Sequence, residues 1–240
     1  MKTTAIFHRA VLVTALCCAG AMLPLTTAVA TERQIEADAV VVTQHKTTVN
    51  DVSFTYSATT GTQPVWNDDG KPVAAVFYTY YQRTDIKDKS KRPLLISFNG
   101  GPGSASVWMQ IAYTGPKALK VDSEGYPLQP YGTKQNPYSV LDTADIVFVN
   151  PVNTAYSRVL PNKDGKMMSR DEQAKMFFGV NADIKYLAEW INTFVTRNER
   201  WQSPKFLIGE SYGTTRVAGL VSQLQDSHWM YFNGVILVSP

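Results

Sequence analysis

A pentapeptide from Gly209 to Gly213 has the pattern of a serine nucleophile. It reads Gly-Glu-Ser-Tyr-Gly, it follows an apolar stretch at 205–210 that is typical of a buried strand, and a helical pattern comes after it. Between a strand and a helix, this pattern forms a tight turn that presents the serine hydroxyl at the edge of a sheet. The outer positions need glycine because a Cβ would strike neighbouring backbone. We therefore predict that Ser211 is a nucleophile, the alternative being a serine that caps the helix.

A glycine-rich loop follows another predicted strand. The apolar stretch 93–98 runs into Asn99-Gly-Gly-Pro-Gly-Ser104. Glycines at a strand end let backbone N–H groups approach an anion, which is either a phosphate or the oxyanion of acyl transfer. A phosphate loop ends in Gly-Lys-Ser or Gly-Lys-Thr, and the proline here removes one N–H. The loop therefore favours an oxyanion hole, with one N–H from Gly100–Gly101 and one from Tyr212, which follows the serine.

The sequence offers no base for this serine. A hydroxyl becomes a nucleophile only when a neighbouring group accepts its proton. Asp226 and His228 follow Ser211, but a helix over 214–225 rises about 1.5 Å per residue and places them roughly 20 Å away. A histidine there suits the negative end of a helix. His45 precedes the predicted sheet, and nothing places it near the serine.

The elements that would position these loops alternate between strand and helix patterns. Residues 47–81 are rich in β-branched and aromatic residues, and the turn Asn67–Gly70 favours a hairpin over a calcium loop. The aromatic run 77–81 fits strand packing better than a sugar-stacking platform. Further apolar strands are predicted at 93–98, 144–150, 205–210 and 234–238. One helix is predicted between 171 and 198, with a buried face formed by Val180, Ile184, Leu187, Ala188, Ile191, Phe194 and Val195.

Together these elements predict an α/β fold. An antiparallel opening precedes parallel strands, and helices cover both faces of the sheet because continuous apolar strands must be buried on both sides. No internal repeat or domain linker interrupts the pattern.

The first thirty residues have the pattern of a cleaved export signal. Lys2 and Arg9 precede an apolar run at 10–25, and Ala28-Val-Ala30 is the small-x-small pattern of a cleavage site. The run is about 16 residues, which is shorter than the roughly 20 needed to span a bilayer. We therefore expect a signal peptide at 1–30, a mature chain of 31–240 that is periplasmic or secreted, and no stable membrane insertion.

Composition and charge narrow the function classes. With 44% hydrophobic and 18% charged residues among 240, the chain is globular. Without Lys2 and Arg9, the mature chain keeps 21 of its 23 basic residues against 20 acidic ones, a net charge of +1. That balance excludes a basic nucleic-acid-binding surface. Both cysteines lie within 1–30 and the three histidines are far apart, so we expect no disulfide, no metal and no cofactor.

The sequence resembles the serine carboxypeptidase family, and most closely its bacterial members. The resemblance is carried by Phe98–Ser106, by Gly209–Arg216 and, more weakly, by Asn150–Ser157. It implies an α/β-hydrolase fold in which Ser211 is the acylating nucleophile. The remaining implied roles are the oxyanion hole, from the N–H groups of Gly101 and Tyr212, and binding of the substrate's terminal carboxylate, by Asn99, Gly100 and Glu210.

The carboxylate-binding role has a consequence for pH. An ionised Glu210 would repel a substrate carboxylate, so Glu210 must be protonated to donate a hydrogen bond, and binding should strengthen in acid. The alternative is that the geometry of the turn alone places Glu210. The chain has Tyr113 where the family has an acidic residue, and its third block reads Asn150-Pro-Val-Asn-Thr-Ala155 in place of Asp-Pro-Val-Gly-Thr-Gly.

We therefore expect a serine-type carboxypeptidase that cleaves peptides with a free C-terminal carboxylate. The chain ends after the strand that follows the nucleophile helix, so the sheet is expected to be incomplete at its C-terminal side, without the acid and base of the triad. Two alternatives stay open. One is an inactive fragment or peptide-carboxylate binder, and the other is an esterase or acyltransferase of the same fold.

Overall fold

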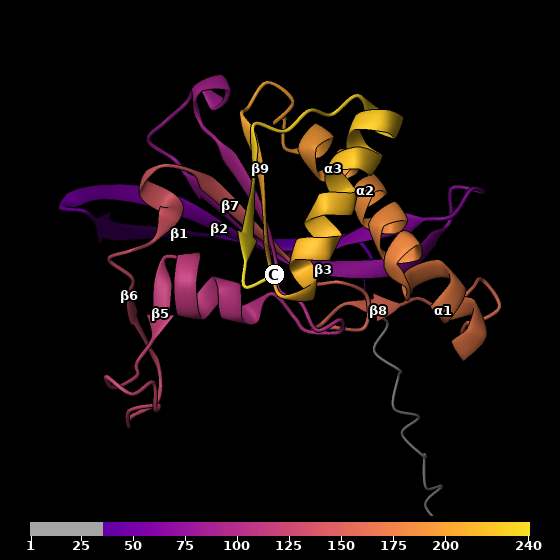
Figure 1. Cartoon of the computed structure of the whole chain (residues 1–240), viewed down its shortest axis with the longest axis horizontal. Coiled ribbons are helices and arrows are strands. Elements are labelled where there is room, and N and C mark those ends of the chain that lie inside the picture. The colour runs from indigo at the N-terminus through magenta and orange to yellow at the C-terminus, as the bar shows by residue number, and fades with distance from the viewer. Residues whose placement is uncertain (1–35) are drawn as a thin grey trace, which may run out of the picture. The chain divides into compact units, whose positions relative to one another are not determined.

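The computed structural model describes residues 36–240, which form an eight-stranded mixed sheet (Figure 1). The strand order is β1-β2-β3-β7-β4-β9-β10, with β8 beside β3, and β5 and β6 form a separate two-stranded sheet. The predicted signal peptide at 1–30 lies outside the described residues and stays a prediction. No helix within 36–240 has the length and apolar character that crossing a membrane requires.

The strands are β1 (Ala39–Val49), β2 (Val52–Trp66), β3 (Pro72–Arg83), β4 (Leu94–Phe98), β5 (Lys117–Leu119), β6 (Thr133–Gln135), β7 (Asp145–Val149), β8 (Arg158–Val159), β9 (Lys205–Glu210) and β10 (Gly234–Val238). The α-helices are α1 (Arg170–Phe177), α2 (Val180–Arg197) and α3 (Tyr212–His228). Short helical turns are η1 (Lys89–Lys91), η2 (Met109–Thr114) and η3 (Val140–Asp142).

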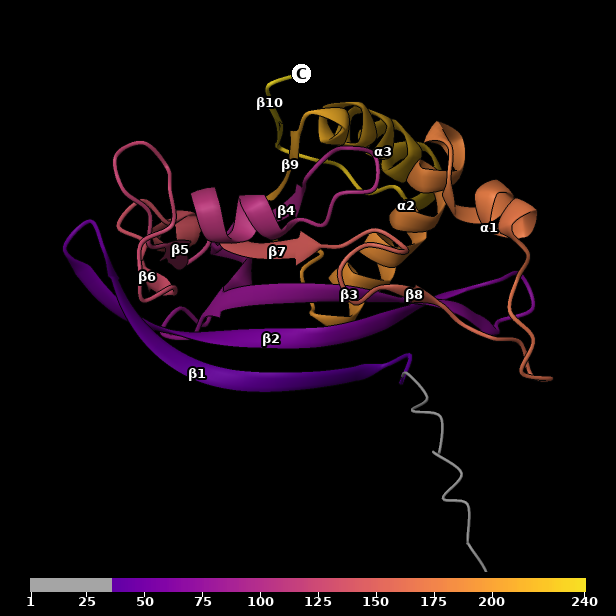
Figure 2. The ribbon, with the colours of Figure 1, turned by 90° about the horizontal axis from the view of Figure 1, so that it is seen from below.

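The antiparallel opening is confirmed, and it starts earlier than predicted. Strands β1, β2 and β3 pair antiparallel, and the turn Asn67–Gly70 joins β2 to β3, where the Asn67 side chain accepts the Lys71 N–H at 2.9 Å. The sheet begins at Ala39 because β1 pairs with β2 along its whole length. Residues Val40–Val42 are exposed on the outermost strand (Figure 2). Their run of consecutive valines lacks the alternation that marks a half-buried strand, so the sequence pattern missed them.

The predicted parallel strands are also confirmed, and their register aligns the two loops of interest. Strand β4 pairs parallel with β7 and β9, and β9 pairs parallel with β10. Phe98 lies opposite Gly209 in this register. The glycine-rich loop after β4 and the serine turn after β9 therefore leave the same edge of the sheet side by side.

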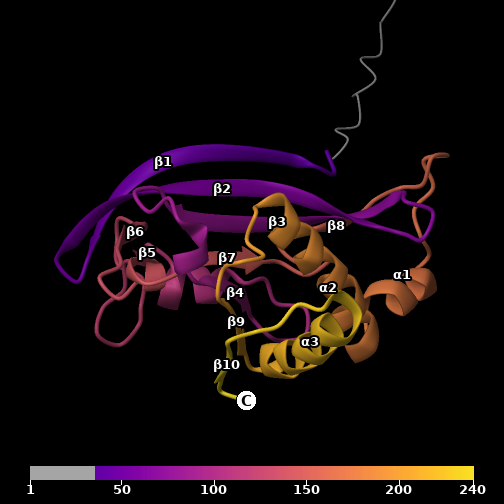
Figure 3. The same ribbon diagram turned by 90° about the horizontal axis from the view of Figure 1, so that it is seen from above.

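Helices and turns cover the two faces of the parallel strands. Leu94, Ile96 and Phe98 point into the core beneath α2 and α3, which lie together in Figure 3. Leu95 points to the opposite face and packs in the cluster that contains Met109 of η2. Alternate residues of one strand thus pack into two cores, which explains why β4 is apolar at every position except Ser97.

The single helix predicted between 171 and 198 is wrong, because the structure breaks it into α1 and α2. Gly179 lies between them with φ +123°, a backbone conformation that favours glycine. Ser169 begins α1 with a capping box, in which Ser169 and Glu172 satisfy each other's backbone N–H. Val180, placed on the predicted buried face, starts the second helix and is 45% exposed. The face from Ile184 to Val195 is buried as predicted.

A buried ionic cluster ties the amino ends of the parallel strands together. Asp145, at the start of β7, is 1% exposed. Its carboxylate accepts hydrogen bonds from Arg92 Nε at 3.0 Å and from Arg200 Nη1 at 2.6 Å. Arg200 also donates to the Arg92 carbonyl at 2.7 Å and to the Tyr80 hydroxyl. One carboxylate therefore pairs with two buried guanidinium groups.

Removing that charge should destabilise the protein strongly. Asp145→Asn leaves the guanidinium groups of Arg92 and Arg200 buried without a counter-charge, so we expect a loss of about 3–5 kcal/mol in the free energy of unfolding. Urea denaturation measures this loss. Asp85→Asn is the matched control, because Asp85 pairs with Arg83 in a partly exposed bridge, and its loss should be below about 1 kcal/mol. Equal losses in both variants would contradict the expectation.

Candidate active site

Ser211 occupies a sharp turn between β9 and α3. Its φ of +55° is unusual for a residue with a side chain. A Cβ on Gly209 would lie 2.1 Å from the Gly213 carbonyl oxygen, and one on Gly213 would lie 3.1 Å from the Phe98 oxygen. Gly209 therefore needs glycine, as predicted, and a side chain at Gly213 would be in tight contact with the Phe98 backbone. The Ser211 side chain makes no capping hydrogen bond to α3 and is exposed, which argues against the helix-cap alternative.

The glycine-rich loop contacts this turn through backbone. A Cβ on Gly100 would lie 2.6 Å from both the Glu210 oxygen and the Tyr212 nitrogen, and 2.9 Å from the Ser211 Cβ. Gly100 is therefore required by the close approach of two backbone segments. Gly101 has φ +108°, a conformation that favours glycine as well. The structure thus brings together all the residues to which the sequence assigned a role, and the oxyanion roles of Gly101 and Tyr212 stay predictions.

Asn99 connects the loop to Glu210. Its side-chain Nδ2 donates to Glu210 Oε2 at 3.0 Å, and its Oδ1 accepts the Met109 N–H at 3.0 Å. Its backbone N–H donates to Ser106 Oγ at 3.2 Å. Asn99 is 2% exposed, so these bonds hold the side chain in one orientation. Asn99 and Glu210, predicted as partners in carboxylate binding, are therefore in direct contact beside the serine.

A buried ion pair beneath this site was missed by the sequence analysis. Arg216 of α3 is 1% exposed, and its Nε donates to Asp183 Oδ2 of α2 at 2.7 Å. Arg216 Nη1 also donates to the Asn99 carbonyl at 2.8 Å, and the guanidinium lies 5.0 Å from the centre of the Tyr212 ring. Burial raises the pKa of the Tyr212 hydroxyl, and the Asp183 carboxylate raises it further. The sequence feature that could have predicted this ion pair is Asp183, a charged residue beside the apolar face of the predicted helix.

The third block of the resemblance has a structural role. Asn150 Oδ1 accepts the Ser106 N–H at 2.9 Å, and Asn150 Nδ2 donates to the Phe77 carbonyl at 3.1 Å. An amide serves both partners, whereas an ionised carboxylate has no hydrogen to donate to that carbonyl. Asn153 and Ala155, which replace two family glycines, keep positive φ angles of 63° and 46°. The chain therefore retains the glycine-type backbone without the glycines.

A cavity of about 350 Å³ opens beside the serine turn. Its lining includes Pro102, Val152, Phe177, Asp183, Tyr212 and Arg216. The wall is mostly apolar, and the two charged groups neutralise each other. The cavity therefore has room for an apolar side chain next to Tyr212, the residue that follows the serine.

Neither histidine of the described residues lies near Ser211. His45 is on β1, five strands from β9, which is about 24 Å along the sheet. His228 ends α3, about 25 Å from the serine, and its Nε2 lies 3.2 Å from Glu189 Oε1. The structure thus separates both histidines from the serine, as the helix length and the position of His45 in the sequence indicated. Within 36–240 no group of three His, Cys, Asp or Glu side chains is placed to hold a metal ion.

Comparisons with known proteins agree on one family. A family model described as serine carboxypeptidase matches residues 59–238. Serine carboxypeptidase-like 36 of Arabidopsis thaliana is 26% identical over 174 residues, which are 71% of this chain and 32% of that protein. Pheromone-processing carboxypeptidase kex1 of Sclerotinia sclerotiorum is 30% identical over 138 residues, which are 57% of this chain and 19% of that protein. The chain spans a third or less of these curated relatives.

A solved structure shares the fold. The prohormone-processing carboxypeptidase KEX1(delta)p from Saccharomyces cerevisiae matches 77% of this chain and 38% of its own, with a TM-score of 0.55 and 19% sequence identity. The likeness at this identity concerns the fold, and it agrees with the predicted α/β-hydrolase sheet.

The close contact of Gly100 with the serine turn gives a direct prediction. Gly100→Ala forces the loop and the turn apart, so we expect a loss of about 1–3 kcal/mol in the free energy of unfolding, measured by urea denaturation. Gly132→Ala is the matched control, because a Cβ at Gly132 meets nothing within 4 Å. Its effect should stay within about 0.5 kcal/mol. A Gly100→Ala protein as stable as the control would show that the contact is looser than the structure has it.

Proposed function

The chain belongs to the serine carboxypeptidase family, and we propose that it carries the nucleophile and the carboxylate-binding residues of a serine-type carboxypeptidase. One observation carries the proposal. The Asn99 side chain lies 3.0 Å from the Glu210 carboxylate, directly beside the turn that presents Ser211. The Asn99 amide and the Glu210 carboxyl group can bind a free carboxylate. Because they lie next to Ser211, they suit a substrate in which the bond to be cleaved is one residue from its C-terminal carboxylate.

Substrate binding follows from the charges at this site. A terminal carboxylate that approaches Glu210 is attracted only when Glu210 is protonated, because two ionised carboxylates repel each other. A protonated Glu210 donates one hydrogen bond, and the Asn99 amide supplies another. Gly100 leaves room for the substrate backbone because it has no side chain. Peptide binding should therefore strengthen as the pH falls.

The reaction would proceed through an acyl-enzyme. The Ser211 oxygen attacks the carbonyl carbon of the last peptide bond while a base accepts its proton, and the oxyanion accepts hydrogen bonds from the N–H groups of Gly101 and Tyr212. The base then returns the proton to the leaving amine, and the C–N bond breaks. Water hydrolyses the acyl ester in the second half of the reaction. The 350 Å³ cavity at Tyr212 would accept the side chain on the acyl side.

Residues 36–240 supply the serine, but neither of their histidines is near enough to serve as the base. The acid and base of the triad would therefore come from outside these residues. Without them the chain binds a peptide carboxylate and does not turn it over, which is the alternative that the positions of His45 and His228 favour. An esterase or acyltransferase is less well supported, because neither needs the contact between Asn99 and Glu210.

The cellular setting is part of the proposal. The pattern at residues 1–30 supports export and cleavage of a signal peptide, and the protein would then work in the periplasm or outside the cell. The substrate there would be a peptide with a free C-terminal carboxylate. The near-neutral charge of residues 31–240 is the reason to expect no nucleic-acid partner.

Peptide binding tests the carboxylate site. A peptide with a free C-terminus should bind at least fivefold more tightly than its C-terminal amide, and its affinity should rise by tenfold or more from about pH 7 to about pH 5, because only a neutral Glu210 does not repel the carboxylate. Glu210→Gln should bind with little pH dependence, because glutamine donates without a proton. Glu199→Gln is the control, since Glu199 pairs with Lys89 elsewhere, and it should behave as the wild type. Calorimetric titration measures each affinity. If the peptide with a free C-terminus and its C-terminal amide bind equally well, the proposal is wrong.

A fluorophosphonate probe tests the activation of the serine. Because neither histidine of 36–240 lies near Ser211, the 240-residue chain should react no faster than Ser211→Ala, followed by gel fluorescence or mass spectrometry. Rapid labelling that disappears in Ser211→Ala would instead show that this chain contains its own base, and the carboxylate-binder alternative would then be wrong.

A further inference from the structure

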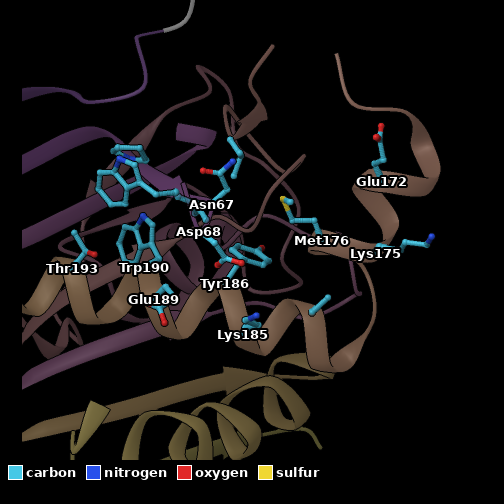
Figure 4. A pocket seen from close by; sticks show the side chains of 15 residues that line it. Asn67, Asp68, Glu172, Lys175, Met176, Lys185, Tyr186, Glu189, Trp190 and Thr193 are labelled. Carbon is cyan, nitrogen blue, oxygen red and sulfur yellow. The ribbon is translucent and has the colours of Figure 1, made fainter. Parts of the chain in front are cut away.

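The outer edge of strand β1 has no neighbouring strand within residues 36–240. β1 pairs with β2 along its whole length of 11 residues, and it stands at one end of the strand order (Figures 2 and 3). A cavity of about 700 Å³ lies elsewhere, between the β2–β3 turn and helices α1 and α2 (Figure 4), and no residue of β1 lines it. The edge of β1 is therefore a separate surface, to which neither that cavity nor the serine turn contributes.

The register of the sheet shows which backbone groups lie on this edge. The Thr84 N–H donates to the Thr55 carbonyl at 3.0 Å, so the backbone groups of Thr55 point toward β3. Successive residues of a strand point these groups to opposite sides, so those of Tyr56 point toward β1 and those of its partner His45 point toward β2. The even-numbered residues from 40 to 46 therefore point their N–H and C=O groups away from the sheet. These residues are Val40, Val42, Gln44 and Lys46.

Strand β1 lacks the features that keep an exposed edge from pairing. Val40, Val41 and Val42 are 50%, 67% and 55% exposed. The strand contains no proline, its pairing with β2 has no bulge, and Lys46 is its single Lys, Arg, Asp or Glu residue. Proline, bulges and charged side chains are the usual protection of an edge strand. A long regular edge without them is suited to the addition of another strand.

The strand is complementary to itself when a second copy runs antiparallel to it. Residues whose backbone groups point outward must lie opposite each other, and a register in which Val40 meets Val42 satisfies this condition. Val41 then lies opposite Val41 of the second copy. The same register places Lys46 opposite Glu36, an exposed residue just before β1. Pairs of β-branched residues and pairs of opposite charge both stabilise neighbouring strands.

We propose that β1 is a dimer interface, at which a second copy of this chain extends the sheet antiparallel with its two-fold axis at Val41. The backbone groups of Val40 in one copy exchange hydrogen bonds with those of Val42 in the other. The two Val41 side chains form a non-hydrogen-bonded pair, in which side chains lie closest. Strand β9 is five strands away, about 24 Å along the sheet, so the proposal does not depend on the chemistry at Ser211.

Sedimentation of the full chain tests the interface. We expect a dimer that forms as the concentration rises through about 10–100 µM, because pairing along one strand edge makes a small interface. Val41→Lys places two ammonium groups opposite each other at the axis and should weaken dimerisation about tenfold. Val52→Lys is the matched control, because Val52 is 49% exposed but lies in β2, and it should dimerise as the wild type does. Thermal melting checks that both variants fold.

Three outcomes of this experiment would overturn the proposal. The first is a chain that stays monomeric throughout this range, and the second is equal weakening by Val41→Lys and Val52→Lys. The third concerns β10, the strand at the other end of the strand order, where Ile236 is 44% exposed. If Ile236→Lys removes the dimer and Val41→Lys does not, the interface lies at β10.

Charge reversal tests the register. Lys46→Glu places two carboxylates opposite each other, and Glu36→Lys places two ammonium groups opposite each other, so each variant should weaken dimerisation about threefold or more. The double variant Glu36→Lys/Lys46→Glu restores opposite charges and should dimerise as the wild type does. A double variant that dimerises no better than the two single variants would contradict the antiparallel pairing.

Amide hydrogen exchange tests the backbone contacts. In the dimer the N–H groups of Val40 and Val42 donate to the second copy, so their exchange should slow at least fivefold from dilute to concentrated protein. The N–H groups of Val41 and Thr43 point toward β2, and their exchange should change much less. NMR measures both pairs in the same sample. Exchange at Val40 and Val42 that does not depend on concentration would show that β1 does not pair with a second copy.

Discussion

The site depends on one contact between two backbone segments. The loop after β4 and the turn after β9 approach so closely that a single methyl group at Gly100 would lie 2.6 Å from the backbone of Glu210 and Tyr212. This approach sets the position of Ser211 relative to the glycine-rich loop. It also explains why Gly100 must be glycine, whereas Gly209 must be glycine because a Cβ there would strike Gly213 within the turn itself. The packing of the two segments therefore requires glycine at position 100, which is also a position of the predicted site.

The parallel pairing of β4 and β9 is what allows this contact. At the amino ends of the strands, Asp145 binds Arg92 and Arg200 in the core. At the carboxyl ends, Arg216 joins the Asn99 carbonyl to Asp183 of α2. Buried ion pairs are costly to break even where they add little net stability, so both clusters select one register. The register of β4 and β9 in turn sets how the loops that follow these strands lie relative to each other.

Much of the fold was predictable from local pattern. Strands β9 and β10 have the bounds that their apolar runs predicted. Burial on both faces explains the apolar run of β9, whereas Val235–Leu237 of β10 are exposed in the structure. The opening strand β1 was missed, since its exposed valines do not alternate with polar residues. The helix break at Gly179 was missed as well, because one glycine within a periodic helical pattern does not by itself mark an end.

The sequence alone determined which residues could do chemistry at this site and which could not. Gly-Glu-Ser-Tyr-Gly between a strand and a helix predicted Ser211 as the nucleophile, and the length of the following helix indicated that His228 lies far from it. Only the tertiary structure decided which side chains meet. The contact of Asn99 with Glu210 spans 111 residues of sequence, and Asp183 reaches Arg216 across two helices. Local spacing has no information on such contacts, because they arise from strand order and register, which the whole core selects together.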